Sequence, residues 1–375
     1  MKKIILGMLI IVLTGLMPWQ IRAAELPAGE EAVVEPDFSN LDQMLADEGS
    51  GLTLEDLFSQ YMEGNTHVDL GAVGQWLMDR ILGTLIEWKN QSGKLILLLL
   101  AFVLLRGLSD LFDRMHLTDF CFLAIYVLLL YQLLSMAYGM QQVAERCIDK
   151  ITQFILFIQP LMCFVMVFAS GMTVTNLTYE LLVLVLYLVS HVLKYFLPLI
   201  IVYLLIEFAN YAWTKEQFSQ LAKLFRKGVI LAQKVVIGMV FGINMIQSLV
   251  APSVDLVRKN SVVKTVGTLP GVGGAINSVS ELMLGTGLMI KNCVGVCVII
   301  GLLVLFAGPL LEIGLMALFY QVLAAIVQPL TDKRVCGVLA ALSRAGVLYF
   351  IVCFTAVLLV FLTVAILCMM TNVGM

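Results

Sequence analysis

Six charged residues lie inside or beside long apolar runs, where a charge is costly and therefore informative. They are Arg106, Lys194, Glu207, Lys234, Glu281 and Glu312. A charge facing lipid at the bilayer centre costs at least ~2.5–3.5 kcal/mol, so such side chains face protein or a polar pathway, or they snorkel to the interface. Acidic side chains are shorter and reach the interface less easily. We therefore take the three glutamates as candidates for lining or gating a pathway, with snorkelling as the alternative for all six.

A further group of candidates lies between residues 269 and 313. Pro270, Gly271, Gly273 and Gly274 open this stretch and predict a flexible or re-entrant turn. Apolar residues then recur at helical spacing on one side, until Lys291 and Asn292 interrupt them before a strongly apolar run. A half-polar helix beside a membrane span is expected to face protein or water rather than lipid. The lysine and asparagine therefore join the candidate pathway.

Catalytic and metal-binding patterns are absent from the sequence. The three histidines are scattered, and no H-E-x-x-H, nucleophile elbow or paired-carboxylate motif occurs. The eight cysteines lie in or beside apolar segments and lack two-pair zinc spacing; Cys293 and Cys297 share a helical face, where packing is favoured over metal binding. We expect neither an enzyme, nor a cofactor, nor a metal site.

The composition indicates the fold class that must position these residues. Hydrophobic residues make up 61% and charged residues 13%, and the mean hydropathy is +0.98. A soluble domain has roughly twice that share of charge. Apolar runs near the ~20 residues that cross a bilayer predict an all-α polytopic membrane protein with about seven to nine transmembrane or re-entrant helices. Nothing indicates a basic nucleic-acid-binding face.

The predicted spans fill residues 93–375. They cover 93–112, 118–138, 151–170, 179–213, 228–250, 292–308, 309–330 and 346–370. The run 179–213 is too long for one crossing, and we expect it to break between Lys194 and Pro198.

The region before the spans has three predicted parts. Residues 1–24 resemble a signal peptide, with an uncleaved anchor as the alternative. Residues 25–50 are acidic and predict disorder. Residues 51–92 predict two amphipathic helices, too few to bury a core alone, which must therefore lie on the membrane, on the rest of the chain or on a partner. An exported signal would place them outside the cytoplasm.

An internal duplication is predicted within the membrane region. The pattern L-A-x-L-x-R-x-G occurs at 221–228 and at 339–346, each time before a long apolar run, and the repeats would cover about 154–250 and 270–375. Three crossings per copy would invert one copy relative to the other, and four would keep them parallel. Basic residues around 215–227 and 333–344 favour a cytoplasmic end in both copies and hence the parallel form.

Four further segments have distinctive sequences: LPGVGG at 269–274, LMIKNCVG at 288–295, QPL at 328–330 and the stretch 218–228. In these segments the chain resembles the stage III sporulation protein AE family. The resemblance implies a role in endospore formation, in the mother-cell membrane around the forespore. It also implies partners from the same operon, a secretion-type ATPase and ring-forming proteins, in a transenvelope channel.

We therefore expect a multispanning, non-enzymatic subunit of a sporulation channel or secretion-like complex, with an extracytoplasmic N-terminal region. Stretch 269–292 and the membrane-depth acids would line or gate its path. A stand-alone secondary transporter for a small solute is the first alternative, and a structural scaffold without a pathway is the second.

Overall fold

The computed structural model describes residues 36–63, 70–111, 116–170, 172–212, 218–266, 273–329, 331 and 333–369. In several stretches, among them 105–111, 116–123, 249–266 and 273–284, it describes the backbone only. The expected signal peptide, the start of the acidic segment, and Pro270 and Gly271 of the expected turn lie outside the described residues.

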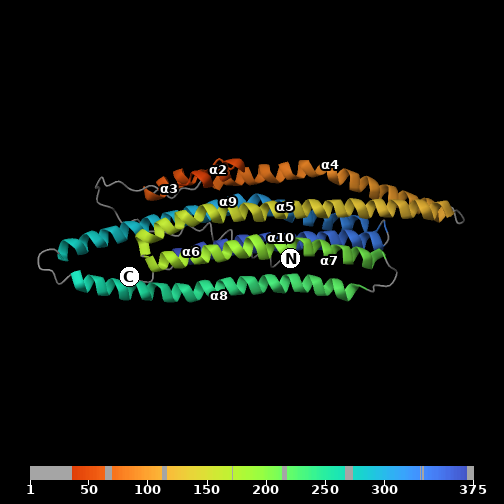
Figure 1. Ribbon diagram of the computed structural model, residues 1–375. Coiled ribbons are helices and arrows are strands. Elements are labelled where there is room, and N and C mark those ends of the chain that lie inside the picture. Colours follow the sequence, from red (N-terminus) through yellow and green to blue (C-terminus); the bar gives the residue numbers. More distant parts are fainter. Residues whose placement is uncertain are drawn as a thin grey trace.

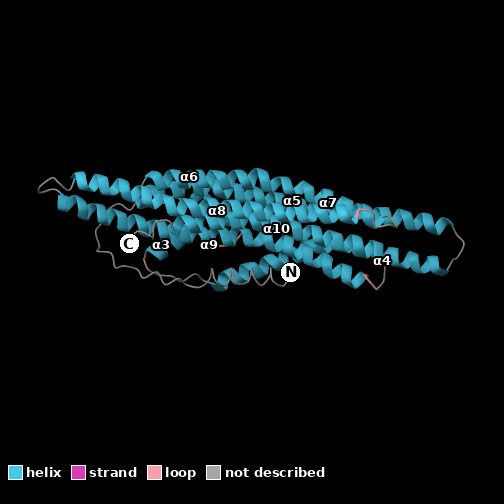
Figure 2. Ribbon diagram, turned by 90° about the horizontal axis from the view of Figure 1, so that it is seen from below, coloured by secondary structure: helices cyan, strands magenta, loops and turns pink. Residues whose placement is uncertain are grey.

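The described residues form helices and turns without a strand, which confirms the all-α class. The helices are α2 (Ser39–Asp47), α3 (Leu54–Met62), α4 (Leu70–Leu111), α5 (His116–Ser170), α6 (Met172–Tyr187), the π-helix η1 (Leu188–Leu193), α7 (Lys194–Ala212), α8 (Ser219–Val266), α9 (Gly273–Val327) and α10 (Lys333–Met369). They pack lengthwise into an elongated bundle, with α2, α3 and α4 along one edge and α8 along the opposite edge (Figure 1; Figure 2). Within the described residues, five helical stretches are long and apolar enough to cross a membrane.

Several spans that the sequence separates are continuous helices in the structure. Helix α5 joins 118–138 to 151–170, and α9 joins 292–308 to the second expected span as far as Val327. Pro160 and Pro309 lie inside these helices, because neighbouring helices can shield and re-satisfy the backbone groups that a proline frees. The number of true crossings therefore does not follow from counting apolar runs.

The run 179–213 also differs from its prediction. The expected break between Lys194 and Pro198 is absent, and Pro198 lies inside α7. The irregularity comes one turn earlier, as the π-helix Leu188–Leu193 between α6 and α7. A π-helical turn takes an extra residue, so it rotates the face of the helix that follows without ending the helix.

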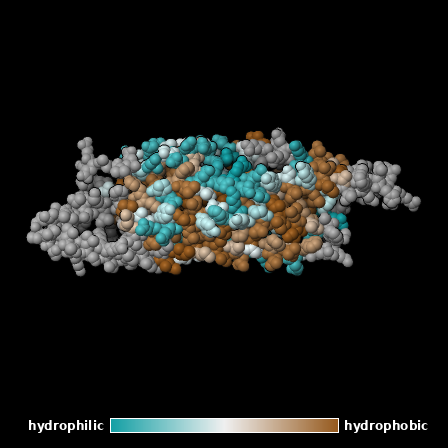
Figure 3. Space-filling view, in the orientation of Figure 1, coloured by the Kyte–Doolittle hydropathy of each residue, from teal (hydrophilic) through white to brown (hydrophobic). Residues whose placement is uncertain are grey.

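Helix α3, the first of the two expected amphipathic helices, packs with α2 on the rest of the chain, which is one of the three locations that the sequence left open. Disorder was expected through residue 50, but Phe38, Leu41 and Leu45 of this segment are buried, with a spacing that suits one helical face. In α3 the side chain of Leu54 lies against Gly301 of α9. Hydrophilic residues gather along the edge of the molecule that α2 and the adjacent part of α4 form (Figure 3).

The two L-A-x-L-x-R-x-G stretches occupy matching places. Residues 221–228 lie in the first turns of α8, and 339–346 lie near the start of α10. Both helices begin at the same end of the bundle and run in the same direction (Figure 1). If the repeats exist, each copy contains a hairpin of two long helices, α6–α7 with α8 in the first and α9 with α10 in the second. The duplication itself stays a prediction.

Candidate functional site

Glu207 lies in an ion pair between two of the long helices. Its Oε2 is 3.3 Å from a guanidinium nitrogen of Arg344 on α10, and the two side chains are 13% and 29% exposed. The hydroxyl of Tyr203 donates a hydrogen bond to Glu207 Oε1 at 3.0 Å. Arg344 donates to the hydroxyls of Tyr203 at 3.3 Å and of Tyr211 at 3.4 Å. Positions 203, 207 and 211 are four residues apart and share one face of α7, so the cluster is built into the helix register.

Arg344 is the arginine of the second L-A-x-L-x-R-x-G stretch. Its counterpart in the first stretch, Arg226, is exposed on α8. The two candidate repeats therefore use the same arginine position differently. Sequence reasoning marked Glu207 but not its partner, because the partner lies in another helix far along the chain. The arginine that recurs in both L-A-x-L-x-R-x-G stretches was the sequence feature that could have marked Arg344 as a candidate.

Lys291 is fully buried and holds two helices together. Its Nζ donates a hydrogen bond to the backbone oxygen of Cys368 at 2.6 Å, in the last turn of α10. Carbonyls there lack partners within their own helix and attract cations. A Cβ on Gly295 would overlap the sulfur of Cys368, so the two helices are in close contact at this level. Lys291 therefore closes a helix end, while Asn292 beside it is half-buried.

The remaining predicted residues lie elsewhere on α9. Glu312 is half-buried, and Glu281 lies where the backbone alone is described. Gly273 and Gly274 begin α9, so the expected separate segment is continuous with the following span. Twenty-one residues separate Lys291 from Glu312, or about 32 Å of helix. The structure thus places these residues at different levels and does not gather them into one cluster.

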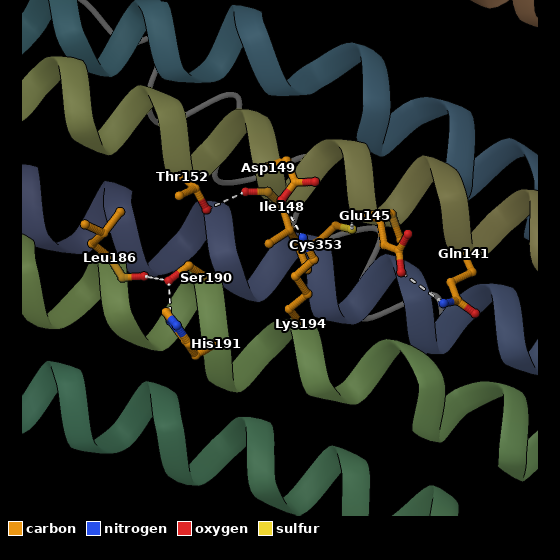
Figure 4. Close-up of polar contacts among 11 residues, drawn as sticks. Gln141, Glu145, Ile148, Asp149, Thr152, Leu186, Ser190, His191, Lys194 and Cys353 are labelled. Atoms are coloured by element: carbon orange, nitrogen blue, oxygen red, sulfur yellow. Dashed lines mark hydrogen bonds and ion pairs between the residues drawn. The ribbon is translucent and has the colours of Figure 1, made fainter.

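A polar stretch that sequence reasoning missed crosses the middle of α5, at residues 141–152 (Figure 4). Asp149 Oδ1 pairs with Lys194 Nζ of α7 at 2.8 Å, with both side chains about half exposed. Gln141 donates a hydrogen bond to Glu145 at 3.0 Å, one turn away. Within η1, the Ser190 hydroxyl donates to the backbone oxygen of Leu186 at 2.7 Å. Lys194 was a candidate from sequence, whereas its partner lies between the expected spans 118–138 and 151–170 and was not a candidate.

These features define a class of protein: an all-α, multispanning membrane protein with a largely buried ion pair between two of its helices. A family profile described as Stage III sporulation protein AE matches residues 52–371, and the chain belongs to that family. A relative of the same description from Bacillus subtilis (strain 168) is 24% identical over 286 residues, which cover 76% of this chain and 71% of that protein. No solved structure matches the chain. Membership in this family supports a role in sporulation.

Proposed function

We propose that the chain is a non-enzymatic membrane subunit of a channel or secretion-like complex that connects the mother cell with the forespore. It would lie in the mother-cell membrane around the forespore, with its N-terminal region outside the cytoplasm. Its partners would be a secretion-type ATPase and ring-forming proteins made from the same operon.

The observation that carries this proposal is the cluster around Glu207 and Arg344. Both residues lie within helical stretches that fit membrane spans. A charge within a membrane span has a high free-energy cost. A paired glutamate and arginine with two tyrosine hydroxyls therefore suggests that polar groups inside the bundle have a functional role. A polar contact between two helices that opens and closes would suit a gate.

The test compares spore formation with protein level in a spore-forming host that carries variants of the cluster. Glu207→Gln and Arg344→Gln should each lower the count of heat-resistant spores. A double reversal, Glu207→Arg with Arg344→Glu, rebuilds the ion pair and should restore the protein level. Spore counts that stay low in this double variant would support a role beyond folding. Normal sporulation in both single variants would remove the cluster from the mechanism.

The alternative, a stand-alone secondary transporter for a small solute, is favoured by one observation. The two helical hairpins that carry the L-A-x-L-x-R-x-G stretches run in the same direction, as parallel repeats of some transporters do. Solute uptake by the purified chain in liposomes, without any partner, would favour this function. Strict dependence on the partner proteins would favour the complex.

A further inference from the structure

Glu48, just after α2, buries its carboxylate between two cations from different helices. The side chain is 3% exposed. Its Oε2 lies 3.3 Å from a guanidinium nitrogen of Arg80 on α4, and its Oε1 pairs with the ammonium of Lys150 on α5. Gly308 of α9 lies beneath, where an added Cβ would be 3.8 Å from the carboxylate. Such a buried carboxylate needs its cationic partners Arg80 and Lys150, because desolvation of an isolated charge costs several kcal/mol.

Among the side chains that the structure describes, the polar contacts of residues 36–63 with the rest of the chain run through Glu48. Besides the two ion pairs, the indole N–H of Trp76 on α4 donates to the backbone oxygen of Glu48 at 3.0 Å. The other side-chain hydrogen bonds of the described segment stay within it, such as the one from the Leu54 backbone N–H to Asp42 Oδ1 at 2.5 Å. The two cations are 41% and 38% exposed, so a competing anion or acidic side chain can reach them.

Apolar contacts complete the attachment, on a face of α9 that carries small residues. Leu54 lies 3.2 Å from the place of a Cβ on Gly301. Cys297, Gly301 and Gly308 share this face of α9, since they are four and eleven residues apart. Burial raises the pKa of the Tyr61 hydroxyl on α3, and the nearby thiols of Cys297 and Cys293 add to the shift. Cys297 is fully buried and lies one turn before Gly301, the glycine against which Leu54 packs.

We propose that residues 36–63 form a detachable cover over α9 and that Glu48 is its latch. When Glu48 loses its charge, or another anion takes its place beside Arg80 and Lys150, apolar contacts alone hold the cover. Detachment of the cover then exposes the face of α9 with Cys297, Gly301 and Gly308. The charge of Glu48 therefore shifts the balance between the attached and the detached state, against a background of apolar contacts. This inference does not depend on the channel role, since it concerns a contact within the chain.

The test measures maleimide labelling of the native cysteines in the full chain, purified in nanodiscs, by peptide-resolved mass spectrometry. Glu48→Gln should speed labelling of Cys297 at least tenfold. Lys150→Met, which removes one of the two partners, should change the rate in the same direction. The matched control is Glu55→Gln, an exposed glutamate of α3, which should stay within twofold of the unchanged chain.

Cys353 separates release of the cover from unfolding of the bundle. This thiol of α10 is fully buried and lies 3.8 Å from the backbone oxygen of Ala144 on α5. It should stay unlabelled while Cys297 reacts. An unchanged rate at Cys297 in both variants would overturn the proposal. A parallel rise at both thiols would overturn it too, because the segment would then leave only when the whole bundle unfolds.

Discussion

The continuity of α5 is the structural finding with the largest measurable consequence. A helix of 55 residues is about 82 Å long, whereas the hydrocarbon core of a bilayer is about 30 Å thick. Its two apolar parts, separated by the polar stretch 141–152, would each suffice for one crossing. If α5 is one rod, as the structure has it, the two parts stand end to end. If the polar stretch were a loop, they would lie side by side in one bilayer.

Spin labels distinguish the two arrangements directly. Val127 and Val167 are exposed on α5, at 55% and 43%, and lie forty residues apart. A continuous helix with a rise of about 1.5 Å per residue separates them by about 60 Å, less a few ångström for bending at Pro160. Replacing Phe157 instead of Val167 shortens the interval to thirty residues and the distance to about 45 Å. Folding back at the polar stretch would bring either pair within about 25 Å, the scale of two packed helices.

The assay is pulsed electron–electron double resonance on spin-labelled double-cysteine variants in nanodiscs, with the native cysteines replaced. Distances near 60 Å and 45 Å, with the longer interval giving the longer distance, confirm a single rod. Two short and nearly equal distances would refute it, and the separate spans of the sequence prediction would be restored. Each pair checks the other, because only a rod makes the distance grow with residue number.

Two further predictions use the candidate repeat as an internal control. Arg344→Gln should lower the free energy of unfolding by about 2–3 kcal/mol. This is less than the ~3–5 kcal/mol lost when a fully buried pair is broken, because Arg344 is 29% exposed. Its matched control, Arg226→Gln on α8, should change the free energy of unfolding by no more than about 0.5 kcal/mol. Gly346→Leu should lower the free energy of unfolding by at least ~1–3 kcal/mol through overpacking, since even a Cβ there would lie 2.9 Å from the Cβ of Ala317. Its matched control, Gly228→Leu, places the new side chain in open space and should have a smaller effect. Thermal unfolding in detergent measures both pairs, and equal effects at the matched positions would contradict the packing described.

Composition and periodicity were sufficient for the fold class and for local helix faces. The apolar face of α3, with Leu54, Leu57 and Phe58, is buried as its spacing predicts. These features depend on neighbours along the chain, within one or two turns. The same spacing in α2 was outweighed by its acidic surroundings and prolines, which predicted disorder where a short helix packs on the bundle.

Partners far along the chain could not be read from one sequence. Asp149 pairs with a residue 45 positions away, and Lys150 with one 102 positions away. Without those partners, the polar residues between two apolar runs look like an ordinary loop between two spans. Glu207 was recognised as a charge at depth because its burial follows from local hydropathy, but the identity of its partner depends on how α7 and α10 pack.

The polar stretch of α5 has a physical role that explains why it lies inside a helix. Long apolar helices pack against one another with little preference for one axial position over another, since a slide of one turn replaces one apolar contact by a similar one. Asp149 and Lys150 are adjacent and point to different neighbours, one to Lys194 of α7 and the other to Glu48 beyond α2. A slide of α5 by one turn, about 5.4 Å, would separate both ion pairs at once and leave the desolvated carboxylate of Glu48 with Arg80 of α4 but without Lys150. The charges therefore act together with the close contacts at Gly295 and Gly346 to fix the axial register of the bundle and, through Glu48, the position of the cover over α9.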